Sequence, residues 1–151
     1  MTTSSGRPLA LLLKAGAFAA GIAAVDRFAQ SVSLSLLSVP LVTSIAVACT
    51  MPQSDAARPR SIIGGHGISF CLTLIAHSTA VPPVVTAAII LVAMQIASTP
   101  HPPAALTPFL VAAHADLASR LALPLAAGCL VAAGIAFALR RIENHERFPV
   151  G

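Results

Sequence analysis

The chain has no tryptophan and no tyrosine, and only 9% of its 151 residues are charged. A soluble domain carries about 25% charged residues, so this composition argues against a soluble globular protein. Without Trp or Tyr, no aromatic belt can fix the depth of the chain at a membrane interface. The three cysteines, Cys49, Cys71 and Cys129, lie in apolar stretches without metal-ligand spacing, which predicts packing residues rather than disulfides or ligands.

Acidic residues are also scarce, and all of them fall in expected loops or in the C-terminal tail. They are Asp26, Asp55, Asp116, Glu143 and Glu146. This placement argues against a proton or sodium site built from intramembrane carboxylates. No helical histidine pair encloses a glutamate, so an intramembrane metalloprotease lacks its motif. We therefore expect no enzyme, no cofactor and no metal. The net charge of +4 lies in loops and ends, so it predicts membrane orientation rather than nucleic-acid binding.

Apolar residues make up 56% of the chain, and the mean hydropathy is +0.87. They are gathered into five blocks, each close to the ~20 residues that a helix needs to cross a bilayer. The blocks are Leu9–Val25, Val32–Met51, Ile62–Ala80, Val84–Thr99 and Leu121–Leu139. The pattern predicts an all-α polytopic membrane protein, with a polar tail over residues 1–8, a transmembrane domain over 9–139 and a basic cytoplasmic tail over 140–151.

A sixth apolar stretch, Ala104–Ala115, is short, about 18 Å as a helix. It is either a re-entrant half-helix or a short sixth crossing. With five crossings, the Lys and Arg residues divide five against four between the two sides of the membrane; with six, they divide seven against two. Because cytoplasmic loops carry an excess of Lys and Arg, we favour six membrane segments with both ends cytoplasmic.

The loop before the third block predicts an anion site. Arg58 and Arg60 lie one residue apart, and Ser61 can cap the helix that follows. The free amides of a helix N-terminus carry partial positive charge, and guanidinium groups beside them strengthen the attraction for an anion. The alternative is that the two arginines only hold this loop on the cytoplasmic side.

Gly64, Gly65 and His66 follow in the first turns of the same helix. Glycine there allows a bend, or the close approach of another backbone or of a ligand. A single histidine in an apolar helix is more often a hydrogen-bonded interior residue than a ligand. The neighbouring glycines and arginines make a binding role for His66 an equal alternative.

His101 stands between prolines, before Pro102 and Pro103. We expect the prolines to impose an extended segment whose carbonyls lack helical partners, which survives in a membrane only inside protein or beside a polar cavity. Many transporters present half-helix ends to substrate at such breaks. The alternative is a tight turn with His101 at the surface. In the six-segment topology His66 and His101 lie toward the same side, so the two histidines are expected to converge.

These residues resemble the HPP family of small integral membrane proteins, named for its His-Pro-Pro motif. The first match runs from Pro52 to His66 in an order like P-x-S-x-x-A-x-P-R-N-x-I-G-G-H, and His101-Pro102-Pro103-Ala104 follows about 35 residues later. The chain departs from the family pattern at Ser61, where asparagine is usual, and at Ala105, where glycine is usual. The resemblance implies a membrane helix bundle, and some plastid and cyanobacterial relatives look like nitrite transporters.

The resulting hypothesis is a multi-pass protein of a bacterial inner membrane that transports or conducts a small inorganic anion, with nitrite the leading candidate. The anion site would be formed by Arg58, Arg60, Ser61, Gly64, Gly65, His66, His101, Pro102 and Pro103. A chain of this size can scarcely enclose a pore alone, so we expect a homo-oligomer in the lipid bilayer. The alternative from another class is a non-transporting membrane scaffold or partner subunit, in which the motifs only shape the fold.

Overall fold

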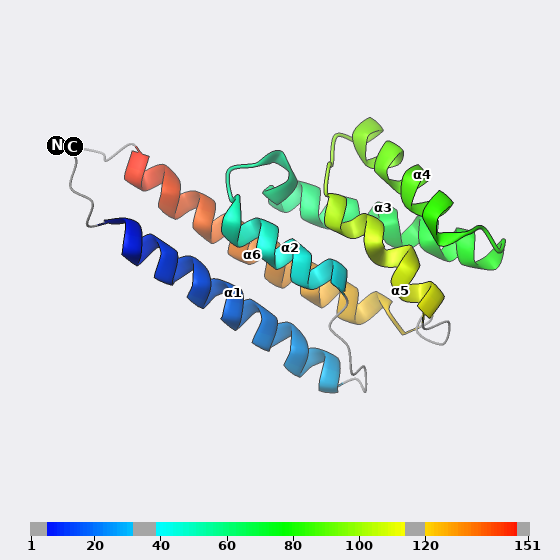
Figure 1. Ribbon diagram of the computed structural model, residues 1–151, viewed down its shortest axis with the longest axis horizontal. Helices are drawn as coiled ribbons and strands as arrows, with labels where there is room; N and C mark the ends of the chain where they lie inside the picture. The colour runs from blue at the N-terminus through cyan, green and yellow to red at the C-terminus, as the bar shows by residue number, and fades with distance from the viewer. Residues whose placement is uncertain (1–5, 32–38, 114–119, 148–151) are drawn as a thin grey trace.

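The computed structural model describes residues 6–31, 39–113 and 120–147, and this part of the chain is helical without strands (Figure 1). Apolar blocks separated by Pro, Gly and polar residues give one helix per block. The elements are α1 (Gly6–Ser31), α2 (Val39–Thr50), the short 3₁₀ helix η1 (Asp55–Ala57), α3 (Pro59–Ser78), α4 (Pro83–Ile96), the 3₁₀ helix η2 (Pro102–Leu106), α5 (Thr107–Ala113) and α6 (Ala122–Arg147).

Successive helices run in alternate directions, with η2 and α5 together acting as one segment (Figure 1). Helix α6 lies beside α1, α2 and α3, while α3 also contacts α4 and α5. An ion pair of 2.7 Å between Lys14 Nζ and Glu143 Oε1 joins the start of α1 to the last turns of α6. The two ends of the helical bundle are therefore well defined, and α1 begins at the end where α6 finishes.

Within the described residues, three helices are long and apolar enough to cross a membrane, spanning Leu9–Arg27, Pro59–Ser78 and Ala122–His145. The other apolar helical stretches, Val39–Thr50, Pro83–Ile96 and Pro102–Ala113, are shorter. Part of the second predicted block, residues 32–38, lies outside the described residues. The chain is thus an all-helical protein with several membrane-capable segments.

Three acidic residues expected in a loop or in the tail, Asp26, Glu143 and Glu146, lie within α-helices instead, and Asp55 lies in η1. Asp26 is in α1, where its carboxylate accepts a hydrogen bond of 2.7 Å from Gln30 Nε2. Glu143 is in α6, because Arg140 and Arg141 end the apolar stretch but not the helix. A helix of 26 residues is about 39 Å long and so extends beyond the ~30 Å of hydrocarbon.

The larger apolar core is formed mainly by α1, α2 and α6, with Ile62 of α3 and Val111 of α5 added, and small residues bring α1, α2 and α6 close. A Cβ added at Gly128 of α6 would overlap Leu41 Cδ1, and one at Gly21 of α1 would lie 2.6 Å from Ile135 Cδ1. The small-residue spacing of Gly128 and Ala132 therefore marks a packing face within the protomer. Gly16 has nothing within 4 Å of such an added atom.

The outer surface of the helices is apolar. Leu11, Leu12 and Ile96 are 67%, 70% and 81% exposed, as expected for side chains that face lipid. Nine polar side chains of the described residues lie inside. The buried polar residues are Ser44, Ser61, His66, Ser69, Thr73, Thr86, Thr99, His101 and Thr107. Polar residues inside a membrane bundle are costly and mark functional sites by default, so the candidate site lies in this interior.

Candidate functional site

The helix that carries the first motif begins earlier than its sequence indicated. Arg58 is the N-cap residue of α3 and Pro59 its first residue. Proline suits this position because its fixed φ is helical and its missing N–H needs no partner. Ser61 therefore lies in the first turn and is buried, so the prediction that Ser61 caps the helix is wrong.

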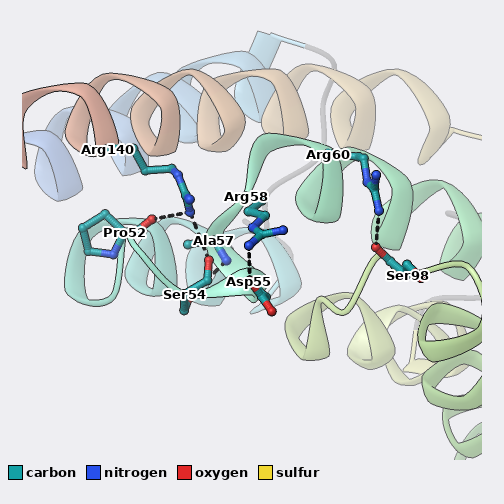
Figure 2. Close-up of polar contacts among 8 residues, drawn as sticks. All are labelled: Pro52, Ser54, Asp55, Ala57, Arg58, Arg60, Ser98 and Arg140. Atoms are coloured by element: carbon teal, nitrogen blue, oxygen red, sulfur yellow. Dashed lines mark hydrogen bonds and ion pairs between the residues drawn. The ribbon is translucent and has the colours of Figure 1, made fainter. Parts of the chain in front are cut away.

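Both arginines of the motif make polar contacts with other residues of the chain (Figure 2). Arg58 Nη2 lies 2.6 Å from Asp55 Oδ1, with 56% of the Arg58 side chain and 67% of the Asp55 side chain exposed. Arg60 Nη2 donates a hydrogen bond of 2.7 Å to the carbonyl of Ser98, just after α4. Arg58 thus remains largely at the surface, while Arg60 ties α3 to the segment before the second motif.

A third arginine, Arg140 of α6, holds the same loop in place. Its Nη1 donates to the carbonyls of Pro52 and Ser54 at 2.9 and 3.1 Å (Figure 2). The hydroxyl of Ser54 accepts a bond from the amide of Ala57 and so caps η1. The sequence indicated Arg140 only as the end of an apolar block and gave no sign of this long-range contact.

Gly64 and Gly65 make room for the segment that leads to the second histidine. A Cβ added at Gly64 would lie 2.8 Å from Thr99 Cγ2, and one at Gly65 would lie 2.6 Å from His101 Cβ. Both distances are too short for real carbon atoms. The close approach expected at this glycine pair is therefore present: the segment from Thr99 to His101 packs directly against the backbone of α3.

The His-Pro-Pro motif forms a helical turn rather than the expected extended segment. His101, with φ −144° and ψ 79°, precedes η2, whose first two residues are Pro102 and Pro103. The amide of Ala104 donates to the carbonyl of His101 at 3.0 Å. Prolines fit because the first positions of a helix need no N–H partner. Pro103 is buried and Pro102 is exposed.

The two motif histidines meet inside the bundle, as the topology predicted. Their ring centroids are 5.1 Å apart with an angle of 57° between the planes. The hydroxyl of Ser44, on α2, lies between them, with its Oγ 2.8 Å from His66 Nε2 and 2.7 Å from His101 Nε2. His66 is 1% exposed, and Ser44 and His101 are 0% exposed. We call these three residues the His-Ser-His cluster.

The carbonyl of Ala56 sets the direction of the hydrogen bonds in the cluster. It lies 2.7 Å from His101 Nδ1 and can only accept, so this nitrogen carries a hydrogen. In neutral His101 the Nε2 atom then accepts from the Ser44 hydroxyl. The Ser44 oxygen in turn accepts from His66 Nε2–H, which leaves Nδ1 of neutral His66 as a bare lone pair.

The Ser44 hydroxyl also has a second acceptor. Its Oγ lies 2.6 Å from the carbonyl of Pro40, one turn earlier in α2. If the hydroxyl donates to Pro40, the Nε2 atom of His101 must itself be a donor. Because His101 Nδ1 already donates to Ala56, His101 is then an imidazolium. Rotation of the Ser44 hydroxyl can therefore satisfy the hydrogen bonds of the cluster with His101 either neutral or protonated.

One atom of the cluster is unsatisfied. His66 Nδ1 is buried and has no hydrogen-bond partner among the residues that the structure describes. The His66 side chain lines a cavity of about 290 Å³ between α3 and α6. The other lining residues are Ile63, Gly67, Phe70, Ala122, Leu125, Ala126, Cys129 and Leu130. Buried polar atoms are nearly always paired, so this atom points to a missing solute or water.

The cluster has no acidic member. No hydrogen bond or ion pair joins a described carboxylate to either ring, so a positive charge there would lack a counter-ion among the residues that the structure describes. Within the described residues, no three His, Cys, Asp or Glu side chains are placed to hold a metal ion. The chemistry that the cluster offers is thus proton transfer and hydrogen bonding to a solute.

Sequence reasoning missed the residue that joins the two histidines. Ser44 lies in an apolar helix, 22 residues before His66 and 57 before His101. A lone serine in such a helix usually bonds the carbonyl one turn earlier, which Ser44 does as well. No spacing in the sequence connects it to either motif.

The fold and the buried polar interior define a multi-pass helical membrane protein. The chain belongs to the HPP family, because the family profile described as "HPP, transmembrane region" matches residues 4–149. No curated protein and no solved structure matches the chain.

Proposed function

We propose that this protein is a transporter for a small monovalent anion, with nitrite the leading candidate, rather than an enzyme. The observation that carries the proposal is the buried His-Ser-His cluster, in which His66 lines a cavity and its Nδ1 has no partner among the described residues. A buried ionisable group without a counter-ion favours a ligand of opposite charge. A protonated cluster together with one bound anion is electrically neutral, which suits passage through a membrane interior.

The hydrogen-bond directions suggest how the proton and the anion are coupled. In the neutral cluster His66 Nδ1 is an acceptor and offers nothing to an anion. A proton taken up at this atom turns it into a charged N–H donor, which strengthens its hydrogen bond to an anion oxygen. The Ser44 hydroxyl can pass a proton on toward His101 by releasing its own hydrogen to Nε2 while it accepts one from His66. Anion binding would therefore require a proton.

The arginines serve the entrance in this proposal. Arg58 is exposed and lies on the same loop as Ala56, whose carbonyl holds His101. Its guanidinium would raise the local concentration of anions at the mouth, an effect that salt weakens. Arg60 acts by position, because its bond to Ser98 holds the segment that carries His101 against α3.

We also propose that all six helical segments cross the inner membrane of a bacterium, with both ends cytoplasmic. The alternating directions of the helices and the Lys14–Glu143 pair support this arrangement. The short segments α2, α4 and η2–α5 would span by local thinning of the bilayer or by association of protomers. The small size of the bundle supports a homo-oligomer.

The test is uptake of nitrite into liposomes that contain the purified protein, with nitrate, formate and chloride as competing anions. We expect nitrite entry above that of empty liposomes. Variants His101→Ala and Arg60→Ala that remain monodisperse in detergent should lose it. Absence of flux for every anion, with the pH gradient in either direction, would reject the transport proposal.

A specific observation favours a second candidate, a membrane scaffold or partner subunit. Arg60 and Arg140 bond backbone carbonyls of the chain itself, which is what motifs that only shape the fold would do. In that case substitutions at the His-Ser-His cluster would lower stability without a selective effect on any anion flux. The liposome experiment separates the two candidates.

A further inference from the structure

One face of α3 carries a polar stripe that continues beyond the His-Ser-His cluster. His66, Ser69, Thr73 and His77 are spaced by three, four and four residues and therefore lie on the same side of the helix. The first three are buried and His77 is exposed. The stripe ends at His77 in the last turn of α3, the end of the helix that leads into α4.

Polar atoms of the second motif continue along this stripe. The hydroxyls of Ser69 and Thr107 both donate to the carbonyl of Ala104, the residue that follows His-Pro-Pro. The next polar residue on the α3 face is Thr73. Polar groups thus recur along this face of α3 from the cluster toward the far end of the bundle.

A second cavity lies at that end. It has a volume of about 190 Å³, is open on one side, and is bounded by α3, α4, α5 and the turn between α3 and α4. The lining residues are Thr73, Ala76, His77, Ala80, Val81, Pro82, Pro83, Thr86, Pro108, Val111 and Ala112. This volume exceeds by about tenfold the minimum that one water occupies, so a small hydrated solute fits.

The hydroxyl of Thr73 indicates that the second cavity holds a solute. Thr73 lines the cavity and is 2% exposed, and its Oγ1 has no hydrogen-bond partner in the part of the chain that the structure describes. The hydroxyl of Thr86, which also lines the cavity, is by contrast bonded to the carbonyl of Pro82. No acidic residue lines the space among the residues that the structure describes, while His77 and Thr73 offer hydrogen-bond donors. The lining suits a small solute that accepts hydrogen bonds.

We infer that the second cavity is a further binding position for the transported anion, on the side of the membrane opposite Arg58, with Thr73 as its hydrogen-bond donor. The inference rests on the proposed transport function. The anion leaves the His-Ser-His cluster along the α3 stripe and binds at Thr73 before its release past His77.

Accessibility of position 73 tests this inference without any measurement of flux. The Thr73→Cys variant is treated with a membrane-impermeant, anionic methanethiosulfonate in spheroplasts and in inverted vesicles, with the wild-type chain as the blank. The Ser78→Cys variant, at the exposed end of α3, reports which side this end faces. The Leu74→Cys variant is the matched control, because Leu74 is the next residue of α3 but is exposed on the apolar surface.

We expect the Thr73→Cys variant to react from the same side as the Ser78→Cys variant, with nitrite slowing the reaction, and the Leu74→Cys variant to stay unmodified. Failure of the Thr73→Cys variant to react from either side, while the Ser78→Cys variant reacts, would overturn the inference. Reaction that nitrite leaves unchanged would also overturn it, since the cavity would then hold water alone.

Flux variants distinguish failure of this inference from failure of the proposed function. The Thr73→Val variant keeps the shape of the side chain without its hydroxyl, and nitrite flux should fall about tenfold, the effect of one lost hydrogen bond of ordinary strength. The Thr73→Ser variant should keep its flux. Equal flux in wild type and the Thr73→Val variant would reject the second binding position alone, whereas a wild type without flux would reject the transport function.

Discussion

The tight contact between α3 and the His-Pro-Pro segment can be tested by adding one methyl group. In the Gly65→Ala variant the new Cβ would lie 2.6 Å from His101 Cβ, 3.6 Å from His101 Cγ and 3.5 Å from the carbonyl oxygen of Thr99. The nearest of these atoms belongs to the root of a buried side chain and cannot swing away. Either α3 or the segment before η2 must therefore move. Gly67 is the matched control, because an atom added there meets nothing within 4 Å.

The expected size of the effect follows from two opposing terms. Replacement of glycine by alanine inside a helix stabilises by about 1 kcal/mol. Overpacking of a well-packed site destabilises by about 1–3 kcal/mol. The Gly67→Ala variant gains only the first term, so its free energy of unfolding should rise by about 1 kcal/mol. The Gly65→Ala variant has both terms, so it should be about 1–3 kcal/mol less stable than the Gly67→Ala variant.

The assay is unfolding of the protein in mixed micelles with increasing mole fraction of dodecyl sulfate, followed by circular dichroism. The displacement of His101 in the Gly65→Ala variant should also reduce nitrite flux. Equal stability of the two variants would refute the close approach, and with it the argument that the glycine pair positions the second motif.

Two further predictions concern the contacts around the cluster. The Ser44→Ala variant leaves both histidine Nε2 atoms without their partner, so its free energy of unfolding should fall by about 1–3 kcal/mol for each unsatisfied group. The control is the Thr43→Val variant, which removes a neighbouring hydroxyl that bonds only carbonyls and should change stability much less. A Ser44→Ala protein as stable as the Thr43→Val protein would contradict this account. The Arg140→Gln variant loses its hydrogen bonds to the loop carbonyls and should be destabilised by about 1–3 kcal/mol. Arg141 is exposed, so the stability of the Arg141→Gln variant should stay within about 0.5 kcal/mol of that of the wild type. Equal midpoints for these two arginine variants would show that the loop does not depend on Arg140.

The helical bundle could be predicted from the sequence because its signals are local. Each apolar block forms a helix, since in lipid the backbone must bond to itself. The convergence of His66 and His101 followed from topology, and the role of Gly64 and Gly65 followed from their lack of a side chain. None of these features depends on knowing which side chains from distant parts of the sequence contact one another.

The remaining details depend on contacts between distant residues. Ser44 gives no sequence signal for its two histidine partners, and Arg140 gives none for the carbonyls that it binds. The expectation for Ser61 failed because Pro59 starts α3 two residues earlier. The expectation for Pro102 failed because proline, which breaks a helix in its middle, is well suited to its first turn.

The most direct test of the central claim is the simultaneous measurement of nitrite and proton movement into liposomes that contain the protein, with a pH-sensitive dye inside. The account predicts that protons enter together with nitrite, and that the Ser44→Ala variant loses both movements while the Thr43→Val variant keeps both. Nitrite entry without proton entry in the wild type, or coupled entry that persists in the Ser44→Ala variant, would contradict the role assigned to the His-Ser-His cluster.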